Sequence, residues 1–143
     1  MIVDTSAMIA IVFGESEAAE FTQHISSERA SMSAASYVEC SVVIDRATAA
    51  RLQRQVDPVD LRADLGRKLE NTVAALHLHI SPVTREQAEL ARRAHREFGP
   101  GSGSSAKLNF GDCFAYALAK DTREPLLFKG DDFRHTDVDI YRS

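Results

Sequence analysis

Short apolar segments alternate with longer segments of helical periodicity along this chain. Two of them, Met1–Val3 and Leu126–Phe128, are brief and end in polar residues, as buried strands do. Weaker strands are predicted at 30–33 and 77–80, and an edge strand at 138–141. Strands that alternate with helices predict an α/β domain with a mainly parallel central sheet flanked by helices.

Several predicted helices have recognisable ends. A buried helix covers Ala7–Phe13 and stops at Gly14, and further helices begin near Ser16 and Ser36. Asp57-Pro58 opens the most periodic helix, in which apolar residues recur at spacings of four and three. These residues are Leu61, Leu65, Leu69, Val73 and Leu76.

The second half of the chain predicts two more helices. Thr84 and Gln87 form a capping box that opens a helix ending at Phe98-Gly99. The segment Gly99–Ser105 (GPGSGSS) indicates a mobile loop, and Asn109 can cap the helix that follows it.

The composition fits one globular domain over residues 1–143, with 44% hydrophobic and 27% charged residues. No apolar run is long enough to span a bilayer. The two cysteines, Cys40 and Cys113, form no CxxC pair, so we expect buried thiols rather than a disulfide and a reducing cytoplasm as the compartment. A net charge of −4 argues against binding nucleic acid through bulk positive charge, but not against an enzyme whose acids hold metal ions.

Acidic residues follow the predicted strands at several points. Asp4 ends the first strand, Glu39 lies in the helix after the second, and Asp112 begins the helix before the last strand. Asp131 and Asp132 come just after that last strand. Ligands of parallel sheets bind at the carboxyl ends of the strands, so the topology directs these acids toward one cleft.

Each of these acids also has a purely structural interpretation. Asp4 can cap the first helix, Glu39 can complete a capping box with Ser36, and Asp112 can lie beneath the Asn109 cap. Asp131 and Asp132 can be turn residues. Gathered in one cleft, however, the carboxylates repel one another unless a cation binds. Oxygen ligands alone favour Mg²⁺, with Mn²⁺ as a substitute, over zinc.

The histidines offer a weaker metal hypothesis. His77 and His79 would share one face of a strand, which predicts either a metal pair or, more simply, a solvated face. His24, His95 and His135 are isolated in the sequence, and we expect them at the surface. No Gly-rich dinucleotide fingerprint or P-loop occurs.

Four segments together resemble PIN-domain ribonucleases, most closely the VapC-type toxins of type II toxin–antitoxin pairs. They are Met1–Ala7 (MIVDTSA), Tyr37–Glu39 (YVE), Asn109–Ala117 (NFGDCFAYA) and Leu126–Phe133 (LLFKGDDF). The resemblance implies a three-layer PIN fold and a metal-dependent endoribonuclease.

The resemblance also implies roles for individual residues. Asp4, Glu39 and Asp112 match the first three catalytic acids of the family, with Asp4 and Asp112 as metal ligands. The family often ends its acidic set with an Asp-x-Asp-Phe turn. Here the first of those positions is Gly130, so Asp132 matches directly and Asp131 is an alternative for the remaining carboxylate. A hydroxyl, Ser6 or Thr5, is expected to orient the first acid.

Partners follow from the same resemblance. It implies an RNA substrate (tRNA or rRNA), a VapB-like antitoxin and a homodimer, with no membrane. Lys107, Lys129 and Arg134 flank the acidic motifs and are candidates for contacting RNA. Two alternatives stay open: a catalytically silent PIN-like interaction module, favoured by Gly130, and a DNA-cleaving nuclease of related fold.

Overall fold

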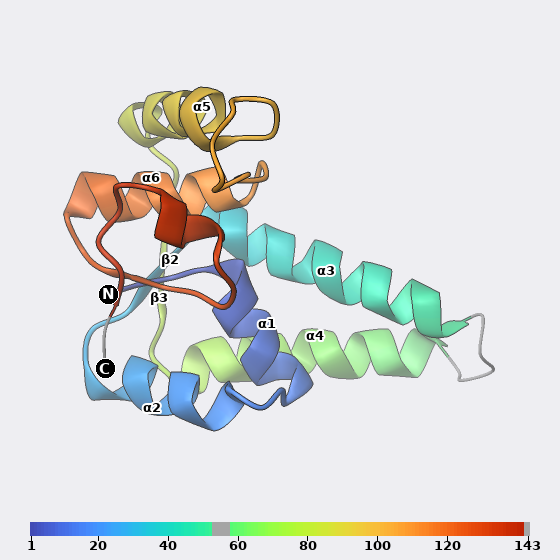
Figure 1. The fold of residues 1–143 in the computed structure, drawn as a ribbon. Helices are drawn as coiled ribbons and strands as arrows, with labels where there is room; N and C mark the ends of the chain where they lie inside the picture. Colours follow the sequence, from blue (N-terminus) through green and yellow to red (C-terminus); the bar gives the residue numbers. More distant parts are fainter. Residues whose placement is uncertain (53–57, 142–143) are drawn as a thin grey trace.

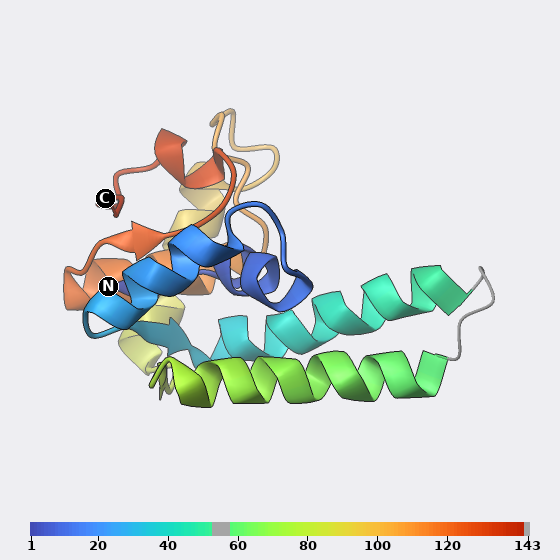
Figure 2. The same cartoon turned by 90° about the horizontal axis from the view of Figure 1, so that it is seen from below.

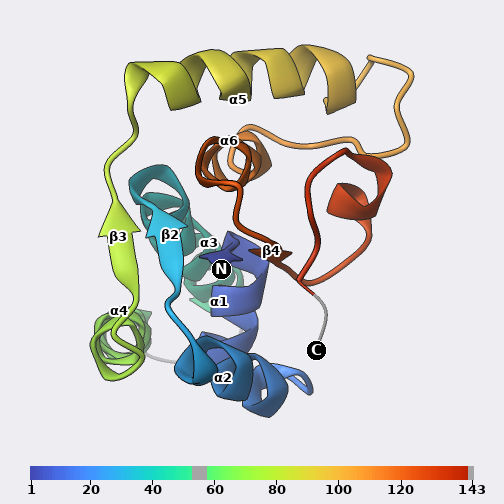
Figure 3. The ribbon, with the colours of Figure 1, turned by 90° about the vertical axis from the view of Figure 1, so that its left-hand side faces the viewer.

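A computed structural model describes residues 1–52 and 58–141, and its centre is a parallel sheet. The strand order is β3-β2-β1-β4, and each neighbouring pair is parallel. The strands are short: β1 (Ile2–Val3), β2 (Ser31–Ser33), β3 (His79–Ser81) and β4 (Leu126–Leu127). Figure 3 shows β3 and β2 side by side, with β4 on the far side of the N-terminus. The predicted α/β class with a parallel sheet is confirmed.

Helices cover both faces of this sheet. They are α1 (Thr5–Phe13), α2 (Ala18–Ser27), α3 (Ala34–Leu52), α4 (Pro58–Ala75), α5 (Arg85–Phe98) and α6 (Asp112–Thr122), with a 3₁₀ turn, η1 (Asp132–His135). Figure 1 shows α5 and α6 on one side of the strands and α1, α2 and α4 on the other. This is the three-layer arrangement that the family resemblance implies.

Strand residues divide between two cores. Ile2 and Leu126 pair in register and pack into the core of α5 and α6. Val3 and Leu127, one residue further along, pack into the opposite core with α1 and α2. Successive side chains of a strand point to opposite faces, so even two-residue strands join both cores.

The ends of α1 and α5 follow the predicted capping chemistry. Asp4 caps α1, and Gly14 ends it in the left-handed region at φ +68°. The Thr84 hydroxyl accepts the Gln87 backbone N–H at 3.1 Å at the start of α5. The Gln87 side chain instead donates to Asp121 at 2.8 Å, so only the Thr84 half of the predicted capping box forms.

The helices α3 and α4 form a hairpin that extends away from the sheet (Figure 2). Arg62 of α4 donates to both carboxylate oxygens of Asp45 on α3, at 2.6 and 2.7 Å. The predicted helix start at Asp57 lies outside the described residues.

Three local predictions were wrong. His77 ends the α4 region with φ +50°, and the strand begins only at His79, so these histidines do not share a strand face. Ser36 lies inside α3, which begins at Ala34, so it does not cap that helix.

The third wrong prediction concerns His24, which packs edge-on against Tyr141, with ring centroids 5.1 Å apart. The ring is half-buried rather than a surface group. The predicted edge strand at 138–141 is reduced to one parallel bridge, between Ile140 and Leu126.

Candidate active site

The predicted acids lie at the point where the strand order of the sheet reverses. The chain leaves β1 toward β2 on one side, and β4 pairs with β1 on the other. Asp4 follows β1, and the turn containing Asp132 follows β4. The carboxyl ends of strands at such a switch point form the usual ligand crevice of an open α/β sheet.

Asp4 is the most deeply buried of the acids, at 1% exposed. Its Oδ2 accepts the backbone N–H of Ser6 at 2.8 Å and the Ser6 hydroxyl at 2.6 Å. Its Oδ1 is buried and has no hydrogen-bond partner among the described residues. Burial, with a smaller contribution from the charge of Glu39, raises the pKa of Asp4.

Ser6 also ties Asp4 to the loop after β4. Its hydroxyl accepts the backbone N–H of Lys129 at 2.9 Å while it donates to Asp4. The hydroxyl predicted to orient the first acid is therefore that of Ser6.

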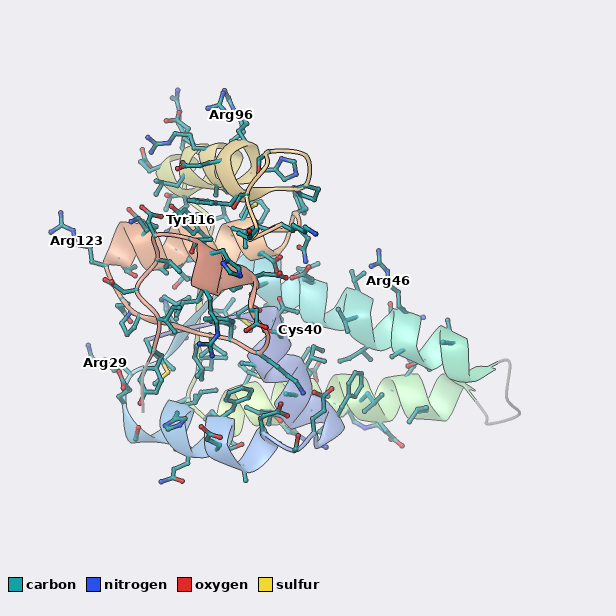
Figure 4. The ribbon with its side chains drawn as sticks, viewed as in Figure 1. Arg29, Cys40, Arg46, Arg96, Tyr116 and Arg123 are labelled. Atoms are coloured by element: carbon teal, nitrogen blue, oxygen red, sulfur yellow. The ribbon has the colours of Figure 1, made fainter. Side chains whose placement is uncertain are left out.

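Glu39 is held by the other predicted hydroxyl. Thr5 donates to its Oε2 at 2.6 Å, from the first residue of α1 to the second turn of α3. In Figure 4, the labelled Cys40 marks this part of α3, beside α1. The two hydroxyls thus orient two different acids.

Gly111 is a site residue that the sequence pattern did not single out. A Cβ at this position would clash with the Glu39 carboxylate, which occupies the space of the missing side chain. In the sequence, the only indication of this role is that a glycine directly precedes Asp112, the first residue of α6.

Asp112 combines a structural and a chemical role. Its Oδ2 accepts the backbone N–H of Asn109 at 2.7 Å, and Asn109 Oδ1 accepts the Asp112 N–H at 3.1 Å. The predicted Asn109 cap is therefore present. Burial, together with the charges of Asp4, Glu39 and Asp132, raises the pKa of Asp112 to about 7. All four matched acids thus meet in one electrostatic neighbourhood.

Asp131 and Asp132 differ in what they face. Asp132 adds to the negative field at Asp112. Asp131 is exposed and pairs with Arg134 at 3.2 Å. These contacts favour Asp132 as the fourth acid.

The basic candidates are partly engaged elsewhere. The Lys129 ammonium lies 2.6 Å from Glu15 and 2.9 Å from Glu17, and Arg134 pairs with Asp131. Lys107 is exposed at a left-handed position, with φ +53°. Of the three, only Lys107 forms no ion pair within the described residues, so it is the best placed to meet a phosphate.

The carboxylate oxygens of the site suit a hard cation, although they do not form a complete coordination shell. Within 1–52 and 58–141, no three His, Cys, Asp or Glu side chains form a ready-made ligand group. The unpartnered Oδ1 of Asp4 and the raised pKa values nevertheless mark a position where positive charge is missing. Mg²⁺ commonly keeps several water ligands and needs only one or two carboxylates. The residues therefore fit such an ion.

The cysteines take no part in this site. Both are buried and free, as predicted, and burial raises the pKa of Cys40 to about 12 and of Cys113 to about 11. Protonated thiols are poor nucleophiles and poor metal ligands.

Comparison with known proteins agrees with this fold and identifies the family. Residues 1–139 match the PIN domain, and the chain belongs to the PIN-domain family. Ribonuclease VapC28 of Mycobacterium tuberculosis is 48% identical over 139 residues, which cover 96% of this chain and 95% of that protein. Ribonuclease VapC42 of the same species is 43% identical over 139 residues, or 96% of each chain. The chain is thus a member of the VapC group.

A solved structure supports the fold independently. VapC20 of M. tuberculosis, described as a toxin that cleaves the sarcin-ricin loop, superposes with a TM-score of 0.65. The superposition covers 99% of this chain and 98% of VapC20, at 16% sequence identity. At that identity the likeness shows the PIN fold alone.

Proposed function

We propose that this chain is a Mg²⁺-dependent endoribonuclease toxin, with Mn²⁺ as a possible substitute, that hydrolyses RNA phosphodiester bonds and so blocks translation and growth. The observation that carries the proposal is the buried Oδ1 of Asp4, which has no partner among the described residues, together with the charges of Asp4, Glu39 and Asp132 that act on Asp112. Membership of the VapC ribonucleases supports RNA as the substrate.

Each acid has a distinct proposed task. Asp4 and Asp112 would hold the ion, since both are buried and both have a raised pKa without it. A bound Mg²⁺ supplies an acidified water and stabilises the leaving oxygen. Glu39, fixed by Thr5, would orient that water or accept its proton. Asp132 is exposed at the mouth and would complete the acidic set.

Partner proteins belong to the same proposal. A VapB-like antitoxin would neutralise the toxin in the cytoplasm, and an Arg or Lys from it could satisfy the acids in place of the metal. A homodimer is proposed from the family resemblance. In the described segments, no helix has the length and apolar character needed to cross a membrane. We propose tRNA or rRNA as the target.

A silent interaction module is the alternative that Gly130 favoured. Asp132 still acts on Asp112, so the glycine at 130 does not empty the fourth acidic position. The two functions differ in their response to metal, because a competent site gains stability from the ion that it binds.

The test is RNA cleavage by the purified chain in EDTA, Mg²⁺, Mn²⁺ and Ca²⁺ in parallel. We expect cleavage in Mg²⁺ and Mn²⁺, little in Ca²⁺ and none in EDTA, with single-stranded DNA as the substrate control. Undiminished cleavage in EDTA would refute the metal mechanism. Absence of both cleavage and a metal-induced rise in Tm would favour the silent module. Sequencing RNA 5′ ends after brief induction would then locate the target.

A further inference from the structure

An aromatic side chain stands exposed beside the acids, although large apolar residues are normally covered. Phe110 is 76% exposed, the highest value among the large hydrophobic side chains that the structure describes. It packs edge-on against Phe114, with ring centroids 5.0 Å apart and planes at 75°. The ring is therefore supported on one edge while most of its surface faces solvent.

Phe110 and Phe114 line two hollows. The first, of about 430 Å³, lies against α3 and is lined by Val38, Val42 and Phe114, with Glu39 on its wall. The second, of about 300 Å³, lies against α5, beside Ala91. The first hollow thus reaches one of the four acids, Glu39.

The backbone on either side of Phe110 is fixed by the site itself. Asn109 exchanges hydrogen bonds with Asp112, and its Oδ1 also accepts the Gly111 N–H at 2.6 Å. Gly111 in turn lies against the Glu39 carboxylate. The backbone that carries the ring is therefore fixed relative to Asp112 and Glu39. A ligand that stacks on the ring would bind with little loss of conformational entropy in the protein.

Positive charge borders both hollows, although the chain as a whole is acidic. Arg46 of α3 lines the first hollow, and Arg92 and Arg96 of α5 line the second. Figure 4 shows Arg46 and Arg96 extending from these two helices. An exposed aromatic ring with cations on either side suits a nucleotide, whose base stacks and whose phosphates need positive partners.

We propose that Phe110 is a stacking platform for an unpaired nucleobase of RNA next to the phosphate that is cleaved. The proposal rests on the proposed ribonuclease function and names how the substrate is positioned. An apolar partner segment or a second copy of the chain would fit the valines, but it would not use the arginines that border both hollows.

The experiment compares Phe110→Leu with Phe110→Trp, because the first removes the aromatic face and the second enlarges it. Cleavage of a single-stranded RNA is measured as KM and kcat. Binding of the same RNA, carrying 2-aminopurine near the cleavage site, is followed by fluorescence in Ca²⁺. We expect Phe110→Leu to raise KM and Kd by roughly 5- to 150-fold. Phe110→Trp should keep or improve both values, and kcat should change little in either variant.

An abasic nucleotide placed next to the cleaved bond distinguishes stacking from general apolar contact. The abasic RNA should bind to the wild type as weakly as intact RNA binds to Phe110→Leu. Combining the abasic RNA with Phe110→Leu should not raise Kd further. The binding arm keeps the test separate from the ribonuclease proposal, because stacking quenches 2-aminopurine whether or not the RNA is cut. Unchanged RNA binding by Phe110→Leu would overturn the proposal, and so would a loss of dimer or antitoxin affinity with RNA binding intact.

Discussion

Two groups of acids in this chain differ in their surroundings: one group is paired with cations, and the other, at the site, receives neutral donors. At the amino end of the sheet, Glu124 and Glu28 lie 2.8 and 3.6 Å from the Met1 ammonium. Beyond the end of α1, Glu15 and Glu17 share the Lys129 ammonium. At the carboxyl end of the sheet, Asp4 and Asp112 instead receive hydroxyl and amide donors, and neither carboxylate lies in an ion pair within the described residues.

The pKa values show the consequence of this difference. Lys129 and Ser16 lower the pKa of Glu17 to about 2, whereas burial and neighbouring acids raise the pKa of Asp112 to about 7. A neighbouring cation stabilises the ionised form of the paired acids. Ionisation of the acids of the site is unfavourable, and a bound cation would remove that penalty. The comparison separates surface charge pairs from a site arranged for a missing positive partner.

The largest effect is expected from removing an acid of the site. Asp4→Asn and Asp112→Asn should each reduce metal-dependent cleavage by more than the roughly 100-fold typical of losing an outer-shell contact. Both variants keep an oxygen that can accept the existing hydrogen bonds, so the metal-free Tm should stay equal or rise. RNA cleavage and thermal unfolding measure the two effects. Full Mg²⁺-dependent activity in either variant would reduce that residue to a helix cap.

The two acids of the final turn should differ. Asp132→Ala removes a charge that acts on Asp112, so cleavage should fall strongly, whereas Asp131→Ala removes only an exposed partner of Arg134. The ratio of their kcat values is the measurement. Equal activities would show that three acids and water complete the site.

Residues that position Glu39 should have intermediate effects. Thr5→Val removes the 2.6 Å hydrogen bond to Glu39, and Gly111→Ala places a methyl group where that carboxylate lies. We expect each to lower activity by about 10- to 100-fold. Thr5→Ser, which keeps the hydroxyl, is the matched control for Thr5→Val. Loss of activity in Thr5→Ser equal to that in Thr5→Val would indicate a packing role instead.

The pH dependence of metal-free stability follows from the raised pKa of Asp112. In the folded state Asp112 keeps its proton up to about pH 7, whereas in the unfolded chain the carboxyl has its ordinary pKa of 3.8 and loses the proton at lower pH. Stability from this group is therefore full below about pH 4 and is lost as the pH rises through about 7. Urea unfolding should show wild type and Asp112→Asn converging near pH 4, and the variant more stable above pH 7. A difference in unfolding free energy between wild type and variant that does not change with pH would contradict the raised pKa of Asp112.

The smallest effect is expected from the paired acids. Glu17→Gln removes one of two exposed carboxylates on Lys129, and the backbone N–H of Lys129 still holds Ser6. We expect near-wild-type cleavage and a small fall in Tm that about 1 M salt suppresses. A large loss of activity would place the Lys129 link within the site.

Several helix ends that depend on neighbouring residues in sequence were predictable here, although the Ser36 cap was not among them. The Asp4 and Thr84 caps, the Gly14 stop and the Asn109 cap each use contacts over two to four residues. The clustering of Asp4, Glu39 and Asp112 was predictable from parallel topology together with the family resemblance.

Features that depend on contacts across the fold were not. The division of work between Thr5 and Ser6, and the space at Gly111 for Glu39, arise where α1, α3 and α6 meet. His77 failed as a strand residue because α4 continues to Ala75 and the chain turns at positive φ before β3. Alternation of polar and apolar residues over four positions does not distinguish such a turn from a strand.

Metal titration followed by thermal unfolding tests the central claim most directly, because it requires no knowledge of the RNA. At a pH above 7, Mn²⁺ or Mg²⁺ should raise the Tm of the wild type and of Glu17→Gln with the same concentration dependence. The ions should leave the Tm of Asp112→Asn nearly unchanged. A wild-type Tm that does not respond to either ion, or an equal rise in Asp112→Asn, would contradict the account.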